Sequence, residues 1–184
     1  MKKNLVRWNE RFWFILSATV IFGVSFALVE AAAIIYFRKV LGLGPSNLEM
    51  NISPSDIFLQ VPNFALLKAS VFEIAIKDKQ FFNFEIFREA ATMFMLASFG
   101  LVAGKNWWQR FGVFLMAFGI WDIFYYVFLY VFISWPQTIT TLDVLFFIPL
   151  PWVSPVWLPV TISAFMITTG IMLLWRFRKK EGFL

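Results

Sequence analysis

The stretch 111–134, FGVFLMAFGIWDIFYYVFLYVFIS, is apolar along its whole length and contains a single charged residue, Asp122. A helix that rises about 1.5 Å per residue needs about 20 apolar residues to cross a hydrocarbon layer roughly 30 Å thick. This stretch therefore predicts a membrane-spanning helix. The same criterion predicts three further spans, at residues 12–37, 86–103 and 156–175. The expected fold is an all-α integral membrane protein with four transmembrane helices in a single transmembrane domain, residues 1–184.

Composition agrees with a membrane protein and removes several kinds of chemistry. The 184 residues are 60% hydrophobic and 15% charged, against about 45–50% apolar and about 25% charged in soluble domains. The chain has 0 Cys and 0 His, which excludes disulfides, thiolate and imidazole catalysis, and the usual ligands of structural zinc and of haem. We therefore expect neither zinc nor haem as a cofactor.

The distribution of Lys and Arg predicts the orientation in the membrane. Four spans place both termini on one side, and ten of the sixteen basic residues flank that side. Four of them precede the first span, two lie between the second and third spans, and four follow the last. By the positive-inside rule, the N- and C-termini face the cytoplasm. The net charge of +5 follows from this topology, so no nucleic-acid partner is expected.

The predicted outer loop, residues 38–85, contains one segment that is too short and too charged to cross the membrane, residues 64–77. Glu73 and Lys77 are spaced i,i+4 in it, which is typical of a short helix lying at the membrane surface. The apolar residues around Glu73 alternate, however, which fits a strand. We expect a short interfacial element here, as a helix with a strand as the alternative.

A second unusual segment, residues 142–154, is apolar but only about half as long as a span. Prolines remove backbone N–H donors in and just after it, at Pro149, Pro151, Pro155 and Pro159. Non-helical backbone at membrane depth must be shielded by protein or line a water-filled cavity. We therefore predict a proline-rich half-segment, re-entrant or interfacial and helical, next to an unusual site.

Few ionisable residues lie inside the predicted spans. A charge near the bilayer centre costs at least about 2.5–3.5 kcal/mol, so such residues face the interior of a bundle and have partners or a function. Arg38 and Glu85 are expected at the level of the lipid headgroups. The predicted topology brings six other side chains into the outer half of the bundle as one candidate ligand-binding cavity: Glu30, Arg88, Glu89, Asp122, Tyr126 and Asp143.

This cavity has four interpretations. Arg88 forms a structural ion pair with one or two of the carboxylates. Alternatively, the excess of carboxylates binds a hard cation, Ca²⁺, Mg²⁺ or Mn²⁺, with Glu30, Glu89 and Asp122 as metal ligands. The same three carboxylates also suit a proton relay with a tyrosine hydroxyl nearby. In the fourth interpretation, two carboxylates act as acid and base on a water molecule, as in an intramembrane hydrolase.

Four motifs contain these intramembrane charges: VEAA at 29–32, REAAT at 88–92, WDIFYY at 121–126 and DVLFFIPLPWV at 143–153. Together they resemble a family of small, uncharacterised prokaryotic integral membrane proteins. The resemblance covers roughly residues 26–165. It implies a multi-helix protein of the prokaryotic inner membrane, and it implies no activity.

These observations predict a multi-pass inner-membrane protein with a non-catalytic role. It is either a small subunit or accessory protein of a membrane complex, or a carrier that binds a cation, a proton or a polar lipid headgroup. Its expected partners are the lipid bilayer and either other membrane subunits or further copies of the chain. The enzymatic alternative is a hydrolase or lipid-modifying enzyme, in which Asp122 pairs with Glu89 or Asp143 as acid and base, and Arg88 holds an anionic group.

Overall fold

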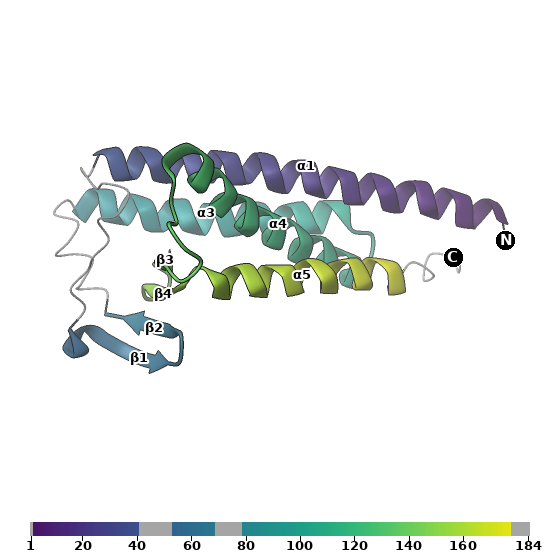
Figure 1. Cartoon of the computed structure of the whole chain (residues 1–184). Helices are drawn as coiled ribbons and strands as arrows, with labels where there is room; N and C mark the ends of the chain where they lie inside the picture. The colour runs from purple at the N-terminus through teal and green to yellow at the C-terminus, as the bar shows by residue number, and fades with distance from the viewer. Residues whose placement is uncertain (1, 41–52, 69–78, 178–184) are drawn as a thin grey trace. The chain divides into compact units, whose positions relative to one another are not determined.

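The computed structural model describes residues 2–40, 53–68 and 79–177, whose helices and strands are drawn in Figure 1. Helices account for most of these residues: α1 (Lys2–Val40), α3 (Lys79–Ala103), α4 (Trp107–Ile133) and α5 (Trp157–Arg176). Each of the four contains a segment that is long and apolar enough to cross a membrane. The prediction of four helices of membrane length is confirmed.

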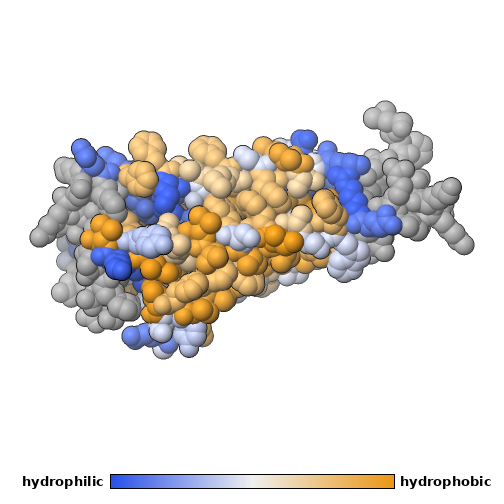
Figure 2. All heavy atoms as spheres, turned by 90° about the horizontal axis from the view of Figure 1, so that it is seen from above, coloured by the Kyte–Doolittle hydropathy of each residue, from blue (hydrophilic) through white to orange (hydrophobic). Residues whose placement is uncertain are grey.

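The helices carry large apolar side chains on their outer surfaces. Phe14 on α1, Phe87 on α3 and Phe165 on α5 are 74%, 73% and 70% exposed. Figure 2 shows that apolar side chains, drawn in orange, dominate the face of the molecule that is visible there. Water disfavours so much contiguous apolar surface, whereas lipid tails solvate it. The surface therefore agrees with residence in a membrane.

The described residues also contain a β-sheet, so the prediction of a purely α-helical fold was wrong. The strands are β1 (Ile57–Val61), β2 (Phe64–Leu67), β3 (Leu142–Phe146) and β4 (Trp152–Pro155). A short 3-10 helix, η1 (Pro54–Asp56), precedes β1. Neighbouring strands are antiparallel, and their order in the sheet is β1-β2-β4-β3.

Residues 142–154 form most of a strand pair instead of the predicted half-helix. β3 pairs with β4, and the connection between them contains Pro149 and Pro151. Two prolines without N–H groups prevent a helix from running through this connection. The Val, Leu, Phe and Trp residues on either side of it favour strands. The hairpin therefore satisfies the backbone of a segment that a helix would leave with missing hydrogen bonds.

β1 and β2 are joined by a two-residue loop, Pro62 and Asn63. Asn63 has a φ of 63°, and Pro followed by a residue with positive φ is typical of a type II turn. Asn tolerates this conformation better than most residues. The segment predicted as an interfacial element, 64–77, begins as strand β2. The alternating residues around Glu73, on which the strand alternative depended, lie outside the described residues. Glu73 and Lys77, on which the helical alternative depended, lie outside the described residues.

The chain forms two compact units, and all four helices contribute residues to both. The first contains both termini and is called the termini unit here: Met1–Glu30, Met95–Tyr125 and Thr161–Leu184. The second is called the sheet unit: Ala31–Phe94 and Tyr126–Val160. All four described strands belong to the sheet unit.

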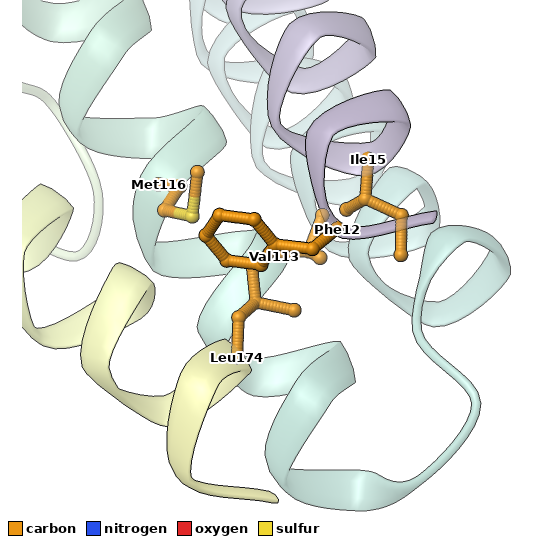
Figure 3. Packing of buried hydrophobic residues seen from close by; sticks show 5 residues of the cluster. All are labelled: Phe12, Ile15, Val113, Met116 and Leu174. Atoms are coloured by element: carbon orange, nitrogen blue, oxygen red, sulfur yellow. The ribbon is translucent and has the colours of Figure 1, made fainter. Parts of the chain in front are cut away.

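An apolar cluster fills the core of the termini unit (Figure 3). Phe12 and Ile15 of α1 pack with Val113 and Met116 of α4 and with Leu174 of α5, and none of the five is more than 6% exposed. The two residues from α1 and the two from α4 are each spaced i,i+3, which puts each pair on one face of its helix. The cluster therefore joins three helices through matching apolar faces.

Glycines allow α4 and α5 to approach closely within the termini unit. A Cβ atom on Gly119 would lie 2.5 Å from the backbone oxygen of Ser163, and a Cβ atom on Gly170 would lie 2.5 Å from the backbone oxygen of Gly112. Small residues at such contacts are a general means of helix packing in membranes. Gly119 lies one turn before Asp122, so this contact also brings Ser163 close to that carboxylate.

The sheet unit has an apolar core of its own. Leu67 of β2, Phe82 of α3 and Val153 of β4 form a cluster in which the three side chains are 0%, 6% and 5% exposed. Partly buried Phe37 of α1 and Phe147, which follows β3, pack against it. The sheet therefore shares a core with helix residues.

Replacing Gly119 by Val is expected to destabilise the protein, because the added side chain meets the backbone of Ser163, which cannot rotate away. Overpacking of this kind costs about 1–3 kcal/mol. Ala164→Val is the matched control, since Ala164 is an exposed position on α5. Thermal unfolding in detergent micelles, followed by circular dichroism, should show a lower melting temperature for Gly119→Val only. Equal melting temperatures for the two variants would contradict the close helix contact.

Candidate functional site

The buried face of α3 in the sheet unit is polar. Glu85, Glu89 and Thr92 are 3%, 6% and 5% exposed, and they follow the buried Phe82 at spacings of three and four residues. Residues at these spacings share one face of a helix. This polar face of α3 therefore points to the interior of the protein. Two carboxylates that are removed from solvent in this way require partners.

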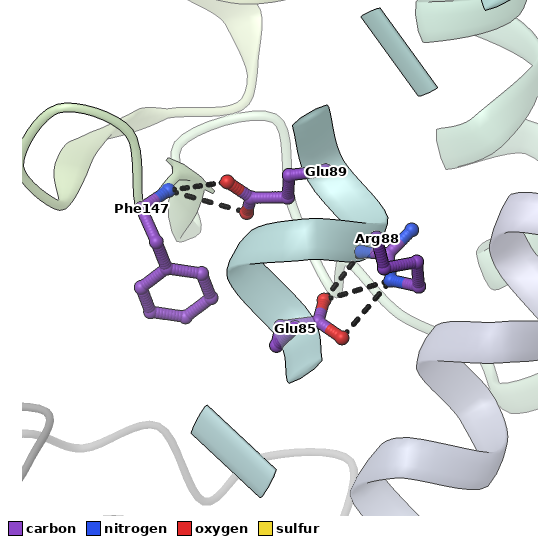
Figure 4. Close-up of polar contacts among 4 residues, drawn as sticks. All are labelled: Glu85, Arg88, Glu89 and Phe147. Carbon is purple, nitrogen blue, oxygen red and sulfur yellow. Dashed lines mark hydrogen bonds and ion pairs between the residues drawn. The ribbon is translucent and has the colours of Figure 1, made fainter. Parts of the chain in front are cut away.

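Arg88 is a partner of Glu85 on the same helix (Figure 4). Its Nε donates hydrogen bonds to both carboxylate oxygens, at 3.0 and 2.9 Å, and its Nη2 donates to Oε1. The two residues are spaced i,i+3, so their side chains lie one turn apart. Glu85 was not among the predicted site residues. The ion pair explains how this carboxylate is stably buried.

Glu89 binds the connection between β3 and β4 (Figure 4). The backbone N–H of Phe147 donates to both carboxylate oxygens, with N···O distances of 2.9 and 3.2 Å. The ring of Phe147 packs edge-on against Phe82, with 5.5 Å between ring centroids. Because Phe82 and Glu89 lie on the same face of α3, this helix holds the hairpin by a charge-assisted hydrogen bond and an aromatic contact.

The end of α4 positions an aromatic ring beside Arg38. Ser134 has a φ of 55°, its N–H donates to the carbonyl of Tyr130, and the N–H of Trp135 donates to the carbonyl of Leu129. The bond from Ser134, a residue with positive φ, to the carbonyl four residues before it is that of an αL cap. The guanidinium carbon of Arg38 lies 4.1 Å from the centroid of the Trp135 ring, which is a cation–π contact. Arg38 is only 7% exposed, so its charge is held inside the protein.

Asp143 on β3 is a buried carboxylate that lies within the electrostatic reach of Arg38. It is 4% exposed, and its Oδ2 accepts a hydrogen bond of 2.9 Å from the hydroxyl of Tyr126. Burial raises the pKa of Asp143 to about 6, although the charge of Arg38, the Tyr126 hydroxyl and the backbone N–H of Val144 each lower it. Arg38, Tyr126, Trp135 and Asp143 are called the Asp143 cluster below.

Two predicted site residues belong to the termini unit. Asp122 is 8% exposed, and its Oδ2 accepts a hydrogen bond of 2.8 Å from the hydroxyl of Ser163 on α5. Glu30 is also 8% exposed and lies on the α1 face that contains the fully buried Ala27. Both carboxylates therefore avoid lipid, as expected for charges inside spans.

Of the six predicted cavity residues, Tyr126 and Asp143 are joined by a hydrogen bond. Arg88 and Glu89 lie in the same unit, and each has a partner that was not predicted for it. The last two predicted residues belong to the termini unit.

Arg38 and Trp135 are the residues of the Asp143 cluster that the sequence did not predict as part of a site. A signal for Arg38 was present. Ala27, Ala31, Ile34 and Arg38 follow one another at spacings of four, three and four, so Arg38 continues the small-residue face of the first span. Because Arg38 lies at the end of the first predicted span, the sequence predicted that it contacts lipid headgroups. In the structure, Arg38 is buried.

Within residues 2–40, 53–68 and 79–177, no group of three or more Asp and Glu side chains is arranged to hold a metal ion. The site for Ca²⁺, Mg²⁺ or Mn²⁺ at Glu30, Glu89 and Asp122 stays a prediction from the sequence.

No family model matches the chain, and no curated protein and no solved structure was found to be similar to it. The resemblance of the four sequence motifs to a family of small prokaryotic membrane proteins stays a prediction. The function is therefore argued from the residues and their contacts.

Glu89→Leu is expected to loosen the β3–β4 hairpin, because the partly buried N–H of Phe147 loses its acceptor. A buried donor without an acceptor costs about 1–3 kcal/mol. Glu89→Gln retains a carbonyl oxygen and should cost less. Hydrogen–deuterium exchange of the peptide that contains Phe147 measures the effect, and thermal unfolding measures the loss of stability. Unchanged protection of this peptide in Glu89→Leu would show that the carboxylate does not anchor the hairpin.

Arg88→Leu alone is expected to destabilise the protein more than Arg88→Leu combined with Glu85→Leu. The single change leaves a buried carboxylate without its cation, at a cost of about 3 kcal/mol, whereas the double change replaces the pair by apolar side chains. A double-mutant cycle of thermal unfolding in detergent checks this. If the two single effects simply add, the ion pair is not the reason that Glu85 is buried.

Proposed function

We propose that this chain is a non-catalytic, multi-pass membrane protein that binds and releases a proton at Asp143. It acts either as a small proton carrier or as an accessory subunit of a membrane complex. One observation supports the proposal above all others. The carboxylate of Asp143 is 4% exposed, is hydrogen-bonded to Tyr126 and lies within the electrostatic reach of Arg38.

The chemistry of the Asp143 cluster suits a proton. A pKa of about 6 means that the carboxyl group exchanges its proton close to neutral pH. Arg38 supplies a positive charge that compensates the ionised carboxylate, so a bound metal ion is not needed for neutrality. The hydroxyl of Tyr126 can donate to the carboxylate and can accept from the protonated acid. Both protonation states of Asp143 therefore have a hydrogen-bond partner.

Proton binding at Asp143 is coupled to folding. Its pKa in the folded protein is about 6, above the ordinary value of 3.8, so the folded protein binds this proton more tightly than the unfolded chain. The resulting contribution to stability is full below pH 3.8 and is lost as the pH rises through about 6. It amounts to roughly 3 kcal/mol at most, and a change from pH 7 to pH 5 restores about 1 kcal/mol.

The predicted topology suggests the side from which the proton is exchanged. β4 directly precedes α5 and the C-terminus follows α5, so a membrane-spanning α5 separates the sheet from the C-terminus. Ten of the sixteen basic residues favour cytoplasmic termini. In a prokaryotic inner membrane, β3 and Asp143 then face the outer side.

Infrared difference spectra of the full chain in lipid, recorded between pH 5 and pH 7.5, test the proton site. We expect the C=O band of a protonated carboxyl group that disappears with a pKa of about 6 and that is missing in Asp143→Asn. Arg38→Leu and Tyr126→Phe should each raise this pKa, because both groups lower it, and the Arg38 charge has the larger effect. A band that persists in Asp143→Asn would assign the titration to another group and overturn the proposal.

Reconstituted vesicles distinguish the two roles. A carrier predicts that wild-type protein collapses an imposed pH gradient faster than Asp143→Asn, with a pH-sensitive dye inside the vesicles as the reporter. An accessory subunit predicts equal rates, together with partner proteins that remain bound after solubilisation in a mild detergent. Equal rates and a lone monomer would contradict both roles.

A further inference from the structure

The β1–β2 hairpin carries large apolar side chains that nothing in the described residues covers. Phe58, Leu59 and Val61 are 65%, 50% and 46% exposed. Of the five residues of β1, only Ile57 is partly covered, and the four that follow are exposed. A strand of a soluble protein normally buries the apolar side chains of one face. β1 therefore suits surroundings that are themselves partly apolar.

The sheet topology keeps this hairpin near the end of a membrane-length helix. β1 is an edge strand, separated by β2 from β4, and neighbouring strands lie about 4.8 Å apart, which puts β1 about 10 Å from β4. β4 ends at Pro155, and α5 begins at Trp157. β1 is therefore held beside the point where the chain enters the membrane.

The backbone of β1 limits how deep the hairpin lies. One edge of β1 pairs with β2, and its other edge is the edge of the described sheet. Unpaired backbone groups are not stable in the hydrocarbon core. The polar turn η1 lies at the same end of the hairpin as Lys68, whose Nζ donates to the carbonyl of Ser55 at 2.7 Å. Apolar side chains next to an unpaired strand edge and polar groups fit the boundary between lipid headgroups and acyl chains.

Pairing with a strand of another molecule fits β1 less well. The register with β2 shifts between Ile57 and Leu59, so Phe58 is an extra residue without a partner on β2. Bulges of this kind bend and twist an edge strand and are a common means of preventing edge-to-edge association. The apolar side chains are thus presented by a strand whose free edge is irregular.

We propose that the β1–β2 hairpin is a lipid-binding surface in which Phe58, Leu59 and Val61 insert at the boundary between headgroups and acyl chains. They insert into the membrane leaflet that lies next to the sheet. Through the pairing of β2 with β4 and of β4 with β3, this contact holds the whole sheet against the membrane surface. The inference does not depend on proton binding at Asp143.

The absence of cysteine from the sequence makes the test direct, because one introduced cysteine carries the only nitroxide label. Phe58→Cys, Leu59→Cys and Val61→Cys are labelled in the full chain and reconstituted into vesicles of phosphatidylcholine and phosphatidylglycerol. Electron paramagnetic resonance then measures the accessibility of each label to oxygen, which partitions into lipid, and to a water-soluble nickel complex. Ser55→Cys, at an exposed polar position, is the water-exposed control, and Phe165→Cys on α5 is the lipid-exposed control.

The three hairpin labels should be accessible to oxygen, as the Phe165→Cys label is, and should be several-fold less accessible to the nickel complex than the Ser55→Cys label. Accessibility to the nickel complex equal to that of the Ser55→Cys label would place the hairpin in water and overturn the proposal. Low accessibility to both reagents, with dipolar broadening between labels, would instead show contact with a second copy of the chain and would also overturn it.

Discussion

The interior of a bilayer contains no water, so every polar group that the chain places there must bond to another part of the chain. The four long helices meet this requirement through their own backbone hydrogen bonds. The segment that contains Pro149 and Pro151 cannot form a continuous helix, because each proline lacks an N–H group. It forms the strands β3 and β4 instead, which pair with each other, and β4 also pairs with β2. The prolines thus explain why this segment is a pair of strands and not a helix.

The same requirement applies to the charged side chains of the sheet unit. Glu85 is bonded to Arg88, and Glu89 is bonded to the backbone N–H of Phe147. Asp143 differs from these two carboxylates because it lies on a strand, outside the membrane-length helices, and accepts a hydrogen bond from the hydroxyl group of Tyr126. Its burial outweighs the effect of the nearby positive charge, and the result is a carboxyl group that titrates near neutral pH.

Much of the fold could be predicted because hydropathy is a property of short stretches of sequence. The helices follow from the length of the apolar runs, and burial of Glu30, Glu89 and Asp122 follows from the cost of exposing a charge to lipid. The prediction of a half-helix at 142–154 was wrong, since a short apolar run fits a helix and a buried strand equally well. The partners of the strands are distant in the sequence, and no local pattern identifies them.

The sequence by itself determined four membrane-length helices, the absence of thiol and imidazole chemistry, and the polar residues available for a site. The tertiary structure decided which of these polar residues contact one another. Arg38 and Trp135 are almost a hundred positions apart in the sequence and form one cation–π pair. Tyr126 on α4 donates a hydrogen bond to Asp143 on β3. The physical reason is that the cost of burying a charge is a property of one residue, whereas the partner that offsets it is chosen by packing.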